Sequence, residues 1–447
     1  MKGTMVCALL FAPDTPDVAS LEPPPPTVRA GVACARQLLG ESLLLGGEGA
    51  PQWLKLGRSA MLHVPAMRPN STTQAIDLSG AGLADGAAAT VAILLERGAP
   101  ALRSLSLEAN AITGEGVATL VAALEQRPPR NRTLEALYLL HNRIGADGGA
   151  SIGGALRRGL LPRLAELHLD WNFLGDAGVA GLSAGIRGHP LRQLWLADNR
   201  VGSAGMRALA TALTVSRDPS GGAAGVGGGD GLAELCLNDN PDVGDEGVAA
   251  LAAALAVGGA PRLRALYLSG VGVGRRGAEA LAGALGAGGA PMLEELHLDR
   301  NPRLGDRGAA ALARALRRRG PQRRDGGGAS GGDGLRVLQL ASSGVGERGI
   351  EALGRAAKRG ALTQLRQLHL GHLAGAGADR AVVALGSALR AGALPRLRYL
   401  SVSTGTRGAH DAGEVSTSAS ASASAWAALA QARSMKSLQL QTARFDE

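Results

Sequence analysis

Three serines of this chain stand in the pattern G-x-S-x-G, which in many hydrolases holds a nucleophilic serine on a sharp turn between a strand and a helix. They are Ser151, Ser183 and Ser330. The flanking residues predict helices around Ser151 and Ser183 and a glycine-rich loop around Ser330, so none has the required context. The chain has 67 glycines in 447 residues, and such matches are expected by chance. We therefore expect no serine nucleophile.

A second chemical pattern is G-x-G-x-x-G, which can place a dinucleotide pyrophosphate at a helix N-terminus. It occurs at residues 272–277 and 344–349. Its second half recurs at almost every strand-to-helix turn of the chain, so the glycines are better explained by turn geometry. His369 and His372 are close in sequence but lack a third metal ligand, and no Walker A, H-E-x-x-H or C-x-x-C sequence is present. We expect no enzyme, no cofactor and no bound metal.

The aromatic and histidine residues are distributed unevenly. The chain has only four Trp and three Tyr, and most of them, with five of its eight His, lie at alternate positions of short leucine-rich segments. Tryptophan, tyrosine and arginine are the residue types that most often anchor protein interfaces. The predicted partner-binding residues are Tyr138, His141, His168, Asp170, Trp171, Trp195, Asp198, Tyr267, His297, Asp299 and Arg300. The alternative is that these rings stack on neighbouring strands about 4.8 Å away and only stabilise a sheet.

An internal repeat must position these side chains. The stretch LAELHLDWNFLGDAGVAGLSAGI, residues 164–186, is one copy. Its first half alternates apolar and polar residues, as in a half-buried strand, and Val179, Leu182 and Ile186 form one stripe of a helix. Good copies begin at Leu102, Leu134, Leu164, Leu191, Leu232 and Leu293, and weaker ones at Thr73, Leu263, Leu335, Leu365, Leu397 and Met435.

This pattern resembles the leucine-rich repeat family, in particular its ribonuclease-inhibitor-like class. The resemblance implies an α/β solenoid, a right-handed βα horseshoe of about 12 repeats with a parallel inner sheet and outer helices. Alternate strand residues then face the concave side, which such solenoids use for binding. Relatives in this class are inhibitors, adaptors and sensing modules, so we expect a non-catalytic scaffold whose partner is another protein.

Two other functions are open at this stage. The alternative is a GTPase-activating regulator similar to Ran GTPase-activating protein, although those relatives carry an acidic tail after the repeats and this chain ends in QTARFDE. A turnover assay with a small GTPase would distinguish it. The other is a ubiquitin-ligase substrate receptor, for which the sequence carries no signature.

Two polar positions recur within the repeat. Asparagines occupy one column, where a buried amide can satisfy the backbone as the strand turns; they are Asn110, Asn142, Asn172, Asn199, Asn240 and Asn301. The column is broken at Ala81, Val271, Ser343, Leu373, Gly405 and Ala443. Aspartates precede several helices and are predicted to be their N-caps; they are Asp85, Asp176, Asp245 and Asp306.

The domain prediction is an N-terminal region over residues 1–72, partly disordered with a helical cap, and a repeat domain over residues 73–447. Flexible insertions are expected near residues 214–231, 317–334 and 411–425, where Gly, Ser and Arg dominate.

The net charge is +9, but nearly all of the cations are arginine, alongside an excess of Ala, Gly and Pro. That composition is typical of GC-rich coding, so we do not expect a nucleic-acid partner. Three scattered cysteines favour a reducing compartment. We expect a cytoplasmic protein, with the nucleus as the alternative if RALRRRGPQRR acts as a localisation signal. No apolar run reaches 18 residues, so no membrane span is predicted.

Overall fold

The computed structural model describes residues 74–86, 88, 91, 101–125, 133–214, 231–318, 334–373, 378–404 and 439–441. Residues 1–72, Ser330 and the three insertions, apart from their outermost residues, lie outside the described part of the chain, so their predictions are not tested.

The strands form one 12-stranded sheet in which neighbours in sequence are neighbours in space. Every pairing is parallel, and neighbouring three-residue strands lie with their middle residues opposite each other. The strands are β1 (Ala75–Asp77), β2 (Ser104–Ser106), β3 (Ala136–Tyr138), β4 (Glu166–His168), β5 (Gln193–Trp195), β6 (Glu234–Cys236), β7 (Ala265–Tyr267), β8 (Glu295–His297), β9 (Val337–Gln339), β10 (Gln367–Leu373), β11 (Tyr399–Thr404) and β12 (Gln439–Gln441).

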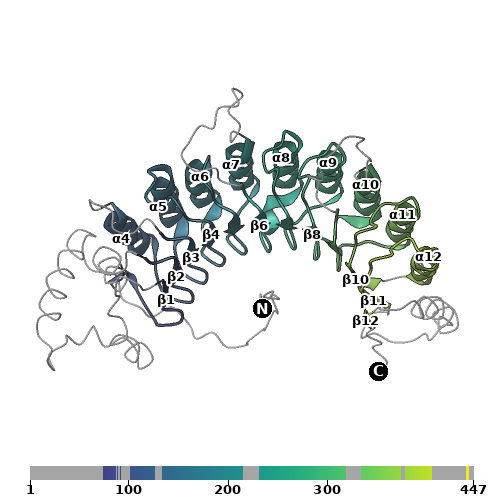
Figure 1. The fold of residues 1–447 in the computed structure, drawn as a ribbon, viewed down its shortest axis with the longest axis horizontal. Helices are drawn as coiled ribbons and strands as arrows, with labels where there is room; N and C mark the ends of the chain where they lie inside the picture. The colour runs from purple at the N-terminus through teal and green to yellow at the C-terminus, as the bar shows by residue number, and fades with distance from the viewer. Residues whose placement is uncertain are drawn as a thin grey trace, which may run out of the picture.

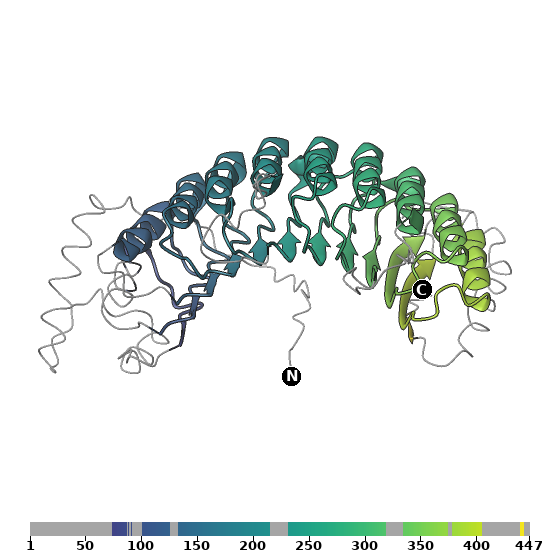
Figure 2. The same cartoon turned by 45° about the horizontal axis from the view of Figure 1, so that its top comes forward.

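Helices follow the strands and line the outer side of an arc, while the strands line the inner side (Figure 1; Figure 2). They are α4 (Gly114–Leu124), α5 (Gly145–Arg157), α6 (Gly175–Ile186), α7 (Ser203–Thr214), α8 (Gly244–Ala256), α9 (Arg275–Gly286), α10 (Gly305–Arg318), α11 (Glu347–Lys358) and α12 (Ala378–Arg390), with one 3₁₀ turn, η2 (Pro241–Val243). The predicted solenoid, and its number of repeats, are confirmed. We number each coil after the strand that it contains.

The repeated leucines form the core between the sheet and the helices. In coil 4, Leu164, Leu167 and Leu169 of the strand side and Leu182 of α6 are all fully buried. Each such side chain contributes about 2 kcal/mol by leaving water. Because the leucines point inward, the two strand residues that flank the middle leucine, such as Glu166 and His168, point to the concave side.

The asparagine column performs the predicted backbone role and also links successive coils. In coil 6 the Asn240 amide donates to the carbonyls of Leu196, Leu237 and Asn238 at 2.8–3.1 Å. Its side-chain oxygen accepts the N–H groups of Asn199 and Val201, both at 2.9 Å. One buried amide therefore satisfies backbone groups in two adjacent coils.

Breaks in this column have different consequences. At Ser343 the hydroxyl donates to the Leu298 carbonyl at 2.6 Å and so replaces one amide contact. Coil 7 has Val271 in place of asparagine, but the coils on either side of it have Asn240 and Asn301. Its strand β7 still has three residues. Coils 10 and 11 lack asparagine consecutively, and there β10 extends to 7 residues and β11 to 6, paired beyond a register shift at Gly371.

The aspartate prediction was wrong about which helix is capped. Asp176 lies within the first turn of α6, and its carboxylate accepts the N–H groups of Gly202 and Gly205 at the start of α7. The same holds for Asp245 toward α9, Asp306 toward α11 and Asp85 toward Thr113, the N-cap of α4. Adjacent helices lie close enough that a first-turn carboxylate reaches the free N–H groups of the next helix rather than its own.

Candidate interaction face

Five predicted residues form one continuous row of rings on the concave face. Tyr138 contacts His168 edge-on at 4.9 Å, His168 stacks on Trp195 at 4.9 Å, and Trp195 reaches across coil 6 to Tyr267 at 5.7 Å. Tyr267 then contacts His297 at 4.5 Å. The Trp195–Tyr267 contact is possible because coil 6 carries the small, buried Cys236 between them. We call Tyr138, His168, Trp195, Tyr267 and His297 the ring row.

The ring row is half-buried, because each ring covers its neighbours. The Nε2 atom of His168 and the Nε1 atom of Trp195 are inaccessible and have no hydrogen-bond partner in the described structure. Burial lowers the pKa of His168, which favours the neutral form of this ring. Burial, with the hydrogen bond from its hydroxyl to Glu166 at 2.7 Å, raises the pKa of Tyr138 to about 12. The ring row therefore has, at least in part, the structural role that the sequence left open, in which rings stack across neighbouring strands and stabilise the sheet.

A second line of residues, all but Asp239 among those predicted to bind a partner, lies where the strands end. His141, Trp171, Asp198, Asp239 and Arg300 each directly precede the asparagine position, and we call them the loop edge. All five have left-handed backbone, with φ between 48° and 59°. Trp171 stacks on His141 at 5.1 Å and is 44% exposed.

Phe173, which the sequence interpretation missed, lies beside this line. It follows Asn172, also has positive φ, at 54°, and is 48% exposed, and the Arg200 guanidinium lies 4.5 Å from its ring centroid. Its rarity was a usable signal, since the chain has only three Phe and this one occupies a turn position. Trp171 and Phe173 are thus two large exposed rings on a backbone that bulky residues seldom adopt.

Asp170 is less open than the sequence suggested. It is only 5% exposed, and its carboxylate accepts the Ala197 N–H at 2.6 Å. Burial, reinforced by the negative charge of Glu108, raises its pKa to about 6. The charged form of Asp170 therefore destabilises the folded protein at neutral pH.

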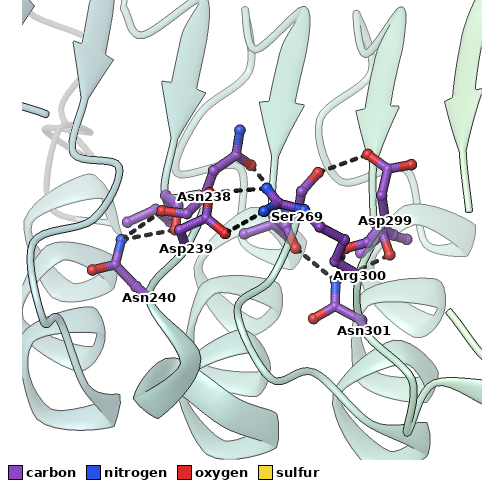
Figure 3. A network of polar contacts seen from close by, with 10 residues as sticks. Asn238, Asp239, Asn240, Ser269, Asp299, Arg300 and Asn301 are labelled. Atoms are coloured by element: carbon purple, nitrogen blue, oxygen red, sulfur yellow. Dashed lines mark hydrogen bonds and ion pairs between the residues drawn. The ribbon is translucent and has the colours of Figure 1, made fainter. Parts of the chain in front are cut away.

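Farther along the loop edge, predicted residues form a network across three coils (Figure 3). Arg300 of coil 8 makes a two-pronged ion pair with Asp239 of coil 6, each contact at 2.8 Å. Coil 7 allows this because it has Gly270 there, where a methyl carbon would lie 2.6 Å from the Asp239 carboxylate. Asp299 accepts the Ser269 hydroxyl at 2.8 Å. Arg300 and Asp239 therefore bind each other, while Trp171 and Phe173 keep open faces.

The opposite edge of the sheet, at the strand starts, carries arginines that the sequence interpretation also missed. Three of them are paired with glutamates: Arg103 with Glu135, and both Arg264 and Arg336 with Glu294. The residues at this repeat position that are arginine are Arg103, Arg192, Arg264, Arg336, Arg366 and Arg398.

The patterns that resembled catalytic or cofactor motifs have structural roles where they are described. Ser151 and Ser183 lie inside α5 and α6, and the Ser183 hydroxyl donates to the Val179 carbonyl. The N–H groups of Gly274 and Gly277, which a phosphate would need, both donate to Asp245. Within the described ranges there is no group of three or more His, Cys, Asp or Glu placed to hold a metal. Nor is any helix there long and apolar enough to cross a bilayer.

Comparison with known proteins yields a repeat family and distant structures. No curated protein matches the chain. It is similar to a chain in the crystal structure of the yeast Rad7–Elc1 complex, with 17% identity, a TM-score of 0.41, and 85% of this chain and 91% of that chain covered. It is also similar to an internalin, inlF, from Listeria monocytogenes, with 13% identity, a TM-score of 0.35, and 93% and 95% covered.

A sequence family described as Leucine Rich repeat matches four segments, residues 130–153, 189–210, 232–252 and 289–313. These segments fall on coils 3, 5, 6 and 8, in phase with the strands and helices of the structure. Together with the strand-helix coil that recurs along the whole sheet, the matches identify the repeats of this chain as leucine-rich repeats.

Proposed function

We propose that this protein is a non-catalytic interaction scaffold that binds a partner protein on its concave face and loop edge. Leucine-rich repeat domains generally mediate protein–protein interactions. The long, helix-containing coils suit the ribonuclease-inhibitor-like class that the sequence resembles, and the few cysteines suit a cytoplasmic setting.

The observation that carries this proposal is the exposure of Trp171 and Phe173. Non-glycine residues in left-handed backbone cost of the order of 1–3 kcal/mol each. The two large rings there are each nearly half exposed and outside the core, and their ring contacts are with the exposed His141 and Arg200. Contact with a partner would bury them, and large aromatic side chains in such positions are typical interface anchors.

The ring row extends this contact area. His168 of the ring row and Trp171 of the loop edge belong to the same coil, three residues apart, and within each group the rings hold one another in place by stacking. A surface fixed in this way loses little conformational freedom on binding, which favours affinity. Stacking and partner contact are therefore compatible roles for the same residues.

The test is affinity capture from a native lysate with the full chain and with Trp171→Ser/Phe173→Ser. The matched control is Val257→Ser/Val383→Ser, which removes two exposed apolar side chains. Val257, 63% exposed, directly follows α8, and Val383, 41% exposed, lies in α12. We expect a protein held by the wild type and by the control to be lost from the aromatic variant, with circular dichroism showing that all three are folded. The same proteins on all three baits would contradict the proposal.

A further inference from the structure

The concave face has a charge opposite to that of the chain. The chain carries +9, yet in coils 2–8 the concave strand positions and the two positions after the third leucine contain a single Lys or Arg, Arg300. Seven carboxylates lie at these positions without being fully buried. We call them the acidic band: Glu108, Glu166, Asp198, Glu234, Asp239, Glu295 and Asp299.

Most of this charge is not neutralised within the described structure. Asp239 is paired with Arg300, and Glu295 lies 3.6 Å from His297. Glu166 accepts the Tyr138 hydroxyl, which is a neutral donor. No described lysine or arginine forms an ion pair with Glu166, Asp198 or Glu234.

The carboxylates also repel one another. Burial, together with the charges of Glu295 and Glu166, raises the pKa of Glu234. Burial, together with the charge of Asp239, raises the pKa of Asp198 despite nearby Arg200. A cation placed between these coils would offset the repulsion at Glu234 and at Asp198.

We propose that the concave face of coils 4–8 docks a basic polypeptide segment, whose arginine or lysine side chains lie between the acidic band and the ring row. This inference rests on the proposed function and specifies the partner. The rings suit the same side chains, since the faces of Trp195 and Tyr267 attract cations. A nucleic acid would be repelled by the acidic band.

The geometry also limits the length of the segment. Parallel strands lie about 4.8 Å apart, so β4 to β8 span about 20 Å, or roughly six extended residues. At the band positions coil 9 has Val337, Gln339, Ala341 and Ser342, none of them acidic, and exposed Arg366 and Arg398 follow on the strand-start edge of coils 10 and 11. The basic segment therefore ends near Asp299.

The experiment uses the full chain and fluorescein-labelled twelve-residue peptides in which Thr alternates with Arg, Lys or Glu. The variant Glu166→Gln/Asp198→Asn/Glu234→Gln removes three charges from the acidic band. The control Glu246→Gln/Glu279→Gln/Glu351→Gln removes three from the convex helices α8, α9 and α11. Fluorescence anisotropy at 50 and 300 mM NaCl gives each Kd.

We expect the Arg and Lys peptides to bind the wild type, with a Kd at least tenfold weaker for the band variant and less than twofold weaker for the convex control. Equal weakening in both variants, or binding of the Glu peptide as tight as that of the Arg peptide, would overturn the proposal. So would light scattering that shows a wild-type dimer abolished in the band variant, because the occupant would then be a second copy of this chain.

The two proposals can fail separately. If the aromatic variant loses its captured partner while the band variant retains it and the peptides do not discriminate, the interaction role stands and the basic segment is excluded. If the band variant alone loses the captured partner, the basic segment stands and the role of the exposed rings is contradicted.

Discussion

Coils 3–8 and coils 9–11 follow the same repeat, yet they solve the strand-ending problem differently. In coils 3–8 a buried asparagine in all but coil 7 turns the backbone after three strand residues. In coils 10 and 11 no asparagine is present, and the strands stay paired, after a register shift between His369 and Gly371, as far as Leu373 and Thr404. The comparison indicates that the strands stay three residues long in coils 3–9, where the coil or an adjacent coil has an asparagine, and lengthen in coils 10 and 11, where neither does.

The same comparison locates the candidate interaction face. The residue before the asparagine position has left-handed backbone in coils 3–6 and also in coil 9, and its side chain lies on the loop edge. In coils 3–6 these projecting side chains are His141, Trp171, Asp198 and Asp239, whereas coil 9 has Ser342. The turn that ends each short strand therefore also places on the surface the residues that we propose to contact a partner protein.

The largest expected effect comes from removing an asparagine. Asn240→Ala would leave as many as four buried backbone groups without a partner, so we expect the free energy of unfolding to fall by about 4 kcal/mol. Ser343→Ala removes only hydroxyl contacts and should cost about 1 kcal/mol. Urea denaturation followed by circular dichroism measures both. Equal losses would show that the two regions do not differ in this way.

The helix layer offers a second contrast. A methyl group at Gly153 of α5 would contact the backbone of α6 at the Gly181 carbonyl, whereas one at Gly354 of α11 would meet Ala384 and Ala388 at 3.7–3.8 Å, an ordinary contact. We expect Gly153→Ala to destabilise by about 2 kcal/mol through overpacking. Gly354→Ala should stabilise by about 0.5–1 kcal/mol, since alanine is the better helix former.

Thermal unfolding of the two glycine variants, with Gly154→Ala as a control on the open side of α5, measures the difference. A stabilised Gly153→Ala variant would mean that α5 and α6 can separate at little cost, and that their close contact does not hold the central coils together.

The stability of coil 4 is expected to depend on pH through Asp170, whereas coil 9 has the uncharged Ala341 at the same position. The pKa of Asp170 is about 6 in the folded protein, above its ordinary value near 4, so folding favours the protonated form. The stability penalty is absent below pH 4, grows as the pH rises, and is complete above pH 6. Asp170→Asn should therefore stabilise the protein by about 1–2 kcal/mol at pH 7.5 and by little at pH 4.

Chemical denaturation of Asp170→Asn and the wild type at the two pH values is the measurement. An equal gain at both would mean that the amide improves packing, because the charge of Asp170 would then not be the source of the penalty.

The sequence predicted the fold because its determinants are local and periodic: leucines every two or three residues, a turn residue and a helical stripe. It also placed Tyr138, His168 and Trp195 on one face, since strand residues alternate. It could not show that Asp176 caps α7 rather than α6, or that Arg300 reaches Asp239 across Gly270, because both depend on the distance between coils. Phe173 was missed because its exposure follows from the φ of one turn residue.

The smallest effect on stability is expected at the position where we expect a large effect on binding. Trp171→Gly relieves left-handed backbone, worth about 1 kcal/mol, but loses the stack on His141, worth about as much, so unfolding should change by less than about 0.5 kcal/mol. Ser342→Gly also removes a side chain from left-handed backbone, but Ser342 makes no ring contact that would be lost. This change should therefore stabilise the protein by about 0.5–1 kcal/mol. Urea denaturation distinguishes the pair. If Trp171→Gly instead lost 2 kcal/mol or more, the ring would be a structural element of the central coils, and its exposure would no longer require a partner.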